Sequence, residues 1–162
     1  MNPEPMEDKL LKQWNLNTEK DIKAKIFEDY AEGDKLTHIL DGEKLVACSY
    51  ALGRILASYN VGLKTAQLRR FYGSLLNIKA SANRIRAESG TDNTFKSKII
   101  PQILMLKPLL ANAKARHRRA ITPFFEVMNP LFDVVKDGDD YDRFCDFVEA
   151  IVAYHKYCGG KD

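Results

Sequence analysis

The sequence has no long apolar run and is poor in glycine and proline. Its 162 residues include nine glycines and six prolines, which argues against a turn-rich all-β fold. The most apolar stretch, residues 99–113, is interrupted by polar residues and prolines and falls short of the ~20 residues that span a membrane. No apolar segment follows a basic start, which argues against a secretory signal. We therefore expect a cytoplasmic protein without membrane contact.

Cysteine is also scarce, since only Cys48, Cys145 and Cys158 occur. An odd number of widely spaced cysteines does not fit the disulfide framework of a small secreted domain. The sequence therefore predicts three free thiols in a reducing compartment.

Motifs that carry catalytic or metal chemistry are missing as well. There is no G-x-S-x-G turn around a nucleophilic serine, no phosphate-binding glycine loop, and no C-x-x-C or H-E-x-x-H spacing. The acidic residues 137–142 lack the order and the distal glutamate of a calcium loop, so we interpret them as a helix cap. His155 falls on an apolar helix face and is expected to be a hydrogen-bonded core histidine. We predict no enzymatic activity, no cofactor and no metal site.

Helical periodicity, in contrast, is present along most of the chain. Apolar residues recur every three to four positions, and no segment keeps the period of two that a half-buried strand shows. The predicted helices run from residues 17–18 to Gly33, from Asp41 to residues 59–60, from an N-cap at Thr65 to residues 89–90, and from residues 137–140 to residues 159–160. Between the last two, restarts or kinks are predicted at Pro101, Pro108, Pro123 and Pro130. The predicted fold class is all-α, a single compact bundle of about five or six helices.

The formal net charge of +3 is an average over segments of opposite sign. Residues 64–119 hold thirteen lysines and arginines against only two acids, a balance of +11. Residues 1–34 have a balance of −4 and residues 120–162 one of −5. A basic middle between acidic ends predicts that one surface binds an anionic partner.

The basic segment is arranged in a way that suits phosphate groups. Arg69 and Arg70 fall in the first turn of a predicted helix, where the helix dipole disfavours cations by ~0.3–1 kcal/mol, so we expect a bound phosphate at that helix start. One stripe of the same helix consists of Arg70, Ser74, Asn77, Ser81 and Arg84. The neighbouring Gly73 leaves room for a nucleic-acid backbone to approach. A second basic cluster consists of Lys107, Lys114, Arg116, His117, Arg118 and Arg119.

Several interpretations of these clusters stand side by side. Basic runs are often solvated helix faces, but two clusters in one segment favour binding of nucleic acid through its phosphate backbone. A DNA-binding helix-turn-helix is disfavoured because no tight turn precedes a helix with base-reading side chains. The alternative is a helical scaffold that acts mainly through protein–protein contacts, with acidic ends that dock onto basic neighbours and no direct RNA binding.

Three ordered blocks of the sequence resemble motifs of a known family. They are F-V-E-A-I-V-A-Y-H-K-Y-C-G-G at residues 147–160, T-A-Q-L-R-R-F at residues 65–71, and L-K-P-L-L-A-N-A-K-A-R at residues 106–116. They resemble the small subunit of type III-A CRISPR effector complexes, the Csm complexes. Two positions depart from the family pattern, because Asn112 stands where tyrosine is usual and Cys158 where tyrosine or phenylalanine is common.

The resemblance implies a small all-helical subunit of an antiviral defence complex, without an active site of its own. Several copies are expected to line a filament and to hold the target RNA paired to the guide, mainly through phosphates. The implied partners are guide RNA, target RNA, the backbone and large subunits, and further copies of this chain. Within one structural domain, residues 1–63 are expected to form an N-terminal helical extension packed on the core, and residues 64–162 the small-subunit core with the basic face.

The predicted RNA-binding residues have two origins. The basic motif positions of the family correspond to Arg69, Arg70, Lys107 and Arg116. Local charge alone adds Lys79, Arg84, Arg86, Lys114, Arg118 and Arg119.

Overall fold

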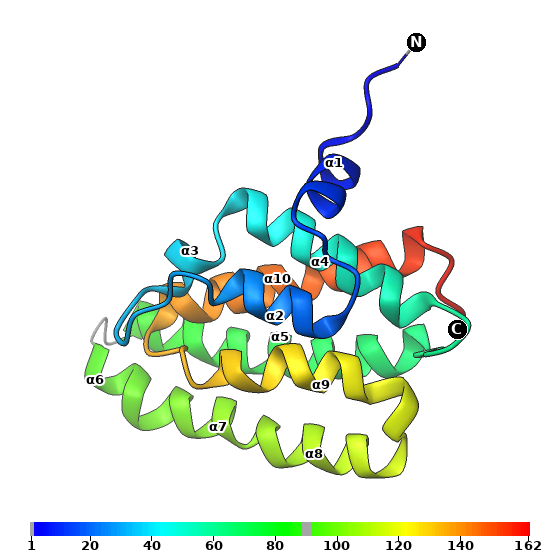
Figure 1. Cartoon of the computed structure of the whole chain (residues 1–162). Helices are drawn as coiled ribbons and strands as arrows, with labels where there is room; N and C mark the ends of the chain where they lie inside the picture. The colour runs from blue at the N-terminus through cyan, green and yellow to red at the C-terminus, as the bar shows by residue number, and fades with distance from the viewer. Residues whose placement is uncertain (1, 89–91) are drawn as a thin grey trace.

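The structure is a computed structural model that describes residues 2–88 and 92–162 (Figure 1). Helices make up 75% of it and the described residues contain no strand, so the predicted all-α class is confirmed. The elements are α1 (Met6–Gln13), α2 (Glu19–Ile26), α3 (Leu36–Ile39), α4 (Gly42–Ala57), α5 (Thr65–Glu88), α6 (Asp92–Thr94), the π-helix η1 (Phe95–Ile99), α7 (Ile100–Leu104), α8 (Leu106–Arg116), α9 (Arg118–Phe132) and α10 (Gly138–Tyr157).

The predicted number of five or six helices is wrong. The described residues form eight α-helices of five or more residues, besides the shorter α3 and α6 and the π-helix. The excess arises mainly in residues 92–116, where short helices follow one another. Pro101 lies in the first turn of α7, just after the π-helix, and Pro108 lies in the first turn of α8, just after the break at Met105. Both prolines therefore accompany helix restarts, as predicted, because an N–H is not needed in a first turn.

Pro123 and Pro130 do not interrupt their helix, so the helix restarts predicted there do not occur. α9 continues through both prolines. Its apolar face is buried in the core, with Phe124 and Leu131 among the enclosed side chains. Burial of each such side chain contributes ~1.5–3 kcal/mol, which together offsets the ~3 kcal/mol that an internal proline costs.

Three of the predicted helix starts have the expected side-chain caps. Thr18 and Asp21 form a reciprocal capping box at α2, in which each side chain accepts a hydrogen bond from the backbone N–H of the other residue. Asp41 caps α4, and Asp137 caps α10 by accepting a hydrogen bond of 2.9 Å from the N–H of Asp140. The interpretation of the acidic cluster as a helix cap is thereby confirmed.

Thr65 is not an N-cap, because it is the first residue of α5 itself. Its N–H donates to the carbonyl of Lys161 at 2.8 Å, and its hydroxyl lies 3.4 Å from Nδ1 of His155. Both polar groups of Thr65 therefore serve contacts with the C-terminal segment. At the start of α5 the capping contact comes instead from Gln67, whose side-chain oxygen accepts a hydrogen bond from the N–H of Lys64.

Two helices end earlier than predicted. α2 stops at Ile26 rather than near Gly33, since the residues that follow are mostly exposed and no buried face supports further turns. α4 stops at Ala57, shortly before the predicted residues 59–60. The predicted end of the third helix at residues 89–90 lies outside the described residues.

The centre of the bundle is formed by α4 and α10, which pack against each other along their length. At Gly53 the two helices are so close that an added Cβ would lie 2.8 Å from atoms of Tyr154 and His155. α10 also contacts α3 and α5, while α1 and α2 cover α4 and α2 reaches α9 (Figure 1). One apolar cluster extends from Leu10 to Ile151, so both the N-terminal region and the later helices contribute to a shared core.

The remaining helices form the layer that positions the basic residues. α8 packs on α9 as a helical hairpin, and α5 packs on η1 and α7. α5 and α8 consequently border the same side of the molecule with a groove between them. None of the helices in the described residues combines the length and apolar character that crossing a membrane requires.

Candidate nucleic-acid interface

α5 presents the polar stripe that the sequence predicts. The hydroxyl of Ser74 donates to the carbonyl of Arg70 at 3.3 Å, and that of Ser81 donates to the carbonyl of Asn77 at 3.4 Å. Arg84 donates from Nη2 to the Ser81 hydroxyl at 3.4 Å. The serines thus satisfy their hydroxyls on their own helix, and the guanidinium groups at the two ends of the stripe are exposed.

The predicted position of Arg69 and Arg70 in the first turn of α5 is wrong. Because the helix begins at Thr65, Arg69 and Arg70 lie in its second turn, beyond the first turn in which the helix dipole acts strongly. The N–H groups of Lys64 and Thr65 already donate to the Gln67 side chain and to the carbonyl of Lys161. This helix end therefore does not offer its first N–H groups to a phosphate.

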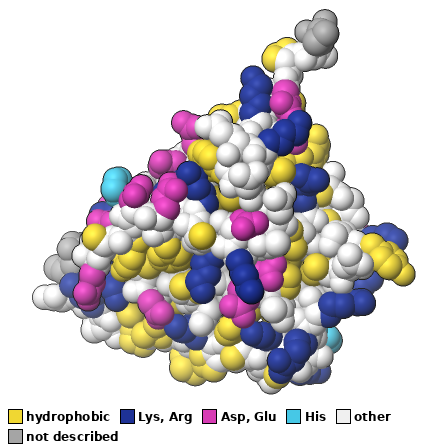
Figure 2. Space-filling view, viewed as in Figure 1, with side chains coloured by type: hydrophobic (Ala, Val, Ile, Leu, Met, Phe, Trp, Pro, Cys, Tyr) yellow, Lys and Arg dark blue, Asp and Glu magenta, His cyan; other side chains and the backbone are white. Residues whose placement is uncertain are grey.

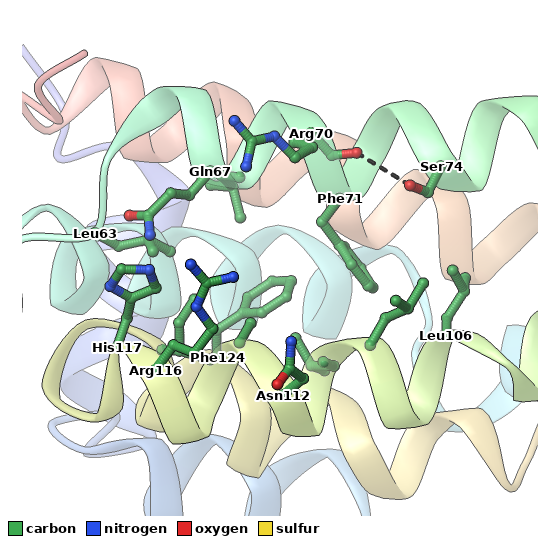
Figure 3. A pocket seen from close by; sticks show the side chains of 15 residues that line it. Leu63, Gln67, Arg70, Phe71, Ser74, Leu106, Asn112, Arg116, His117 and Phe124 are labelled. Atoms are coloured by element: carbon green, nitrogen blue, oxygen red, sulfur yellow. Dashed lines mark hydrogen bonds between the residues drawn. The ribbon is translucent and has the colours of Figure 1, made fainter.

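A groove of about 250 Å³ separates α5 from α8 (Figure 3). Gln67, Arg70 and Ser74 line it from α5, and Asn112 and Arg116 line it from α8. Figure 3 shows the Arg116 guanidinium directed from α8 toward the beginning of α5, where Gln67 lies. The floor is apolar and includes Leu63, Leu68, Phe71, Leu106, Leu110 and Phe124. None of the described residues that line the groove is acidic. Arg70 and Arg116 therefore make the electrostatic potential in the groove positive.

Three of the predicted RNA-binding residues are paired with acidic side chains. Lys107 Nζ lies 2.8 Å from Asp133, and Arg86 Nη1 lies 3.7 Å from Asp142. Lys114 Nζ lies 3.0 Å from the Glu126 carboxylate and 4.5 Å from the centre of the neighbouring Phe125 ring. The charges of these side chains are partly neutralised within the fold.

The other predicted residues are cations that have no acidic partner in the described part of the chain. Within residues 2–88 and 92–162, no ion pair is formed by Arg69, Arg70, Lys79, Arg84, Arg116, Arg118 or Arg119. Arg118 and Arg119 are exposed in the first turn of α9, where the helix dipole disfavours a cation. Figure 2 shows Lys and Arg side chains gathered at the end of the molecule where α8 turns into α9.

Comparison with protein families shows which family this chain belongs to. The family model described as Csm2 Type III-A matches residues 40–161. The chain belongs to the Csm2 Type III-A family. It is a small subunit of the type III-A Csm complex, a CRISPR effector, and the family is one of structural rather than catalytic subunits. Neither a curated protein nor a solved structure matches the chain at a significant level.

The Csm2 match covers more of the chain than the three sequence motifs do. The resemblance in the sequence motifs begins at about residue 64, whereas the family model begins at residue 40 and so includes α4. The packing explains why α4 belongs to this region, since its Gly53 forms the close crossing with α10. Both walls of the groove, α5 and α8, also lie inside the Csm2 match.

In the Csm2 fold, some of the predicted RNA-binding residues lie at the α5–α8 groove and others lie away from it. Arg70 and Arg116 both line the groove, and Arg84 lies further along α5 on the same stripe as Arg70. Arg86 is held on the side of α10, where Gly138 leaves space for its guanidinium. Lys79 is half-buried on α5 and is not among the described residues that line the groove.

The Csm2 groove also contains residues that the sequence did not single out. Leu109 is 62% exposed although it belongs to an apolar helix pattern, and Asn112 presents an amide to the groove. No sequence signal separates an exposed leucine of α8 from its buried neighbours Leu106 and Leu110. The sequence signal that could have found these residues is the family motifs, because Gln67 lies in the block at residues 65–71 and Leu109 and Asn112 lie in the block at residues 106–116.

Proposed function

We propose that this Csm2-family subunit binds RNA through its phosphates with the α5–α8 face. The observation that carries the proposal is that Arg70 and Arg116, on two different helices, line one groove in which none of the described lining residues is acidic. A guanidinium presents a planar fork of donors that binds two phosphate oxygens at once. Two such forks on either side of a groove fit a backbone that passes along it.

The exposed arginines around the groove extend this surface. Arg69 and Arg84 lie on α5, and Arg118 and Arg119 lie at the start of α9. In this proposal the paired Lys107, Lys114 and Arg86 contribute less, because an RNA phosphate has to compete with a carboxylate that is already in contact. Recognition is independent of sequence, since phosphate contacts carry no base information.

In the complex, the subunit is expected to act in repeated copies beside the backbone and large subunits. The ligand is then the guide RNA with its paired target RNA, and cleavage belongs to other subunits. Affinity is summed over copies that are linked in one assembly, so the isolated chain binds RNA more weakly than the complex does. Residues 1–63 serve as the N-terminal helical region packed on the small-subunit core at residues 64–162.

The test compares arginines inside and outside the proposed face. Arg70→Ala and Arg116→Ala are expected to weaken binding of single-stranded RNA, measured by fluorescence anisotropy over a series of salt concentrations. The slope of log K against log salt is negative, and each lost phosphate contact should make it shallower by about 0.7. Arg54→Ala on α4 is the matched control, because Arg54 is equally an exposed arginine but lies outside the groove. If Arg70→Ala and Arg116→Ala bind RNA like the wild type, the proposed face is wrong.

A scaffold role through protein contacts is the second candidate function. It is favoured by large apolar side chains on α7 and the α7–α8 break, since Leu104 is 43% and Met105 is 63% exposed. A scaffold without RNA contact predicts that charge reversal of Arg70 and Arg116 leaves both assembly and RNA retention of the purified complex intact. RNA-dependent assembly that is lost on charge reversal supports the RNA-binding function instead.

A further inference from the structure

The apolar floor of the α5–α8 groove is not needed for binding a phosphate backbone. Phosphate contacts require only cations and donors on the rim, whereas this groove has an apolar base between its two arginines. Its volume of about 250 Å³ is just below the roughly 300 Å³ at which sites for drug-sized ligands begin. The space therefore suits one small flat group.

The aromatic part of the floor has a fixed orientation. The Phe71 ring makes edge-to-face contacts with Phe124, at 5.2 Å between centres and 84°, and with Phe132, at 6.4 Å and 86°. Two such contacts hold the ring from the core side. Phe71 itself is only partly buried and lines the groove, so it presents a rigid aromatic surface there (Figure 3).

The rim supplies the polar groups that a heterocyclic base requires. The amide of Asn112 and the side chain of Gln67 border the groove from opposite helices. Within residues 2–88 and 92–162, the Asn112 amide makes no hydrogen bond to the chain, which leaves a donor and an acceptor available. Leu109, a largely exposed side chain at the same groove, extends the apolar contact area.

We propose that the groove holds one unpaired nucleobase of the bound RNA, with its flanking phosphates at Arg70 and Arg116. This inference rests on the proposed RNA-binding function and adds that a base contacts the apolar floor of the groove. The occupant is a nucleotide rather than an apolar protein side chain because, among the residues that the structure describes, two arginines without an acidic partner and no acid border the apolar space. Stacking on an aromatic ring is tolerant of base identity, so the site does not select a sequence.

The experiment separates base binding from backbone binding. The full chain is titrated with fluorescein-labelled oligouridylate and with an oligomer of equal length whose ribose units lack bases. We expect the wild type to bind oligouridylate at least about fivefold more tightly, which is the lower end for one stacked base. Equal binding of the two oligomers overturns the base site but leaves phosphate binding standing, whereas binding of neither overturns both proposals.

Variants on α8 provide the matched comparison. Ala113→Leu fills the groove without a change in charge, and Ala111→Leu makes the same change at an exposed position that does not line it. Ala113→Leu is expected to abolish the preference for oligouridylate and to leave binding of the base-free oligomer within about twofold, whereas Ala111→Leu keeps the preference. Retention of the preference in Ala113→Leu contradicts the site.

A second pair of variants covers the case in which Ala113→Leu does not fold. Leu109→Ser and Met105→Ser remove leucine and methionine side chains that are 62% and 63% exposed, and only Leu109 lines the groove. Leu109→Ser is expected to reduce the preference for oligouridylate and Met105→Ser to preserve it. A groove that serves a protein side chain gives the opposite result, with both oligomers bound equally and assembly of the complex impaired by Leu109→Ser.

Discussion

The Nε2 atom of His155 lies 2.6 Å from the carbonyl oxygen of Leu63, and both residues are buried. The N–H at Nε2 donates to this carbonyl, which assigns Nδ1 as the acceptor that faces the Thr65 hydroxyl. A neutral imidazole therefore ties the last helix to the chain that enters α5. The expectation of a hydrogen-bonded core histidine is confirmed. Burial lowers the pKa of His155 below its ordinary value of 6.5.

The first prediction concerns the pH dependence of stability. Because the pKa of His155 is lower in the folded than in the unfolded chain, the unfolded chain binds the proton more readily. The contribution of His155 is complete above pH 6.5 and is lost as the pH falls from there through the lowered pKa. Urea unfolding at a series of pH values should show this decrease, and His155→Gln should remove it. The exposed His38 provides the control, since His38→Gln should retain the pH dependence.

The second prediction compares two mid-helix glycines. Gly53→Ala is expected to destabilise the fold by about 1–3 kcal/mol, because the new Cβ would lie 2.8 Å from backbone atoms of α10. Gly73→Ala is expected to stabilise it by about 0.5–1 kcal/mol, because a Cβ there meets nothing within 4 Å and alanine favours the helix. Chemical denaturation measures both values. Effects of the same sign would contradict the α4–α10 crossing.

Much of the fold follows from local sequence signals, and the exceptions have physical causes. The caps at Thr18, Asp41 and Asp137 form as predicted because each satisfies backbone donors within a few residues. The failures depend on contacts between distant segments. Thr65 has the residue type of a cap, yet its groups are used by the C-terminal segment, and Pro123 is tolerated because the core holds its helix together.

The features of the candidate interface also divide into those that the local sequence predicts and those that depend on contacts between distant segments. The sequence locates the basic segment and the arginine stripe of α5, since charge and helical period are local properties. It does not show that Lys107 and Lys114 reach acids of the segment 120–162, or that Arg116 lies across a groove from Arg70. Those relationships arise when α8 folds back on α9, which no periodicity predicts.

The third prediction tests the hydrogen bond that joins the first residue of α3 to Asp140 of α10. The buried carboxylate of Asp140 accepts hydrogen bonds from the N–H groups of Leu36, at 2.9 Å, and Lys136, at 3.0 Å. Asp140→Asn replaces one acceptor oxygen by a donor, so one N–H loses its partner at an expected cost of about 1–3 kcal/mol. Amide hydrogen exchange at Leu36 should accelerate along with the loss of stability. Asp139→Asn, at an exposed neighbouring position, should change neither quantity.

The last prediction uses the three thiols as reporters of packing. Burial raises the pKa of Cys48 to about 12 and that of Cys145 to about 11, and both side chains are enclosed in the core. Cys158, just after α10, is only partly buried. Because the thiolate is the reactive form, an aromatic disulfide reagent at mildly alkaline pH should modify Cys158 rapidly and the other two only on unfolding. Cys158→Ser should abolish the fast phase, whereas Cys48→Ser should leave it unchanged. A second fast thiol in the native protein would contradict the burial of Cys48 on α4 or of Cys145 on α10.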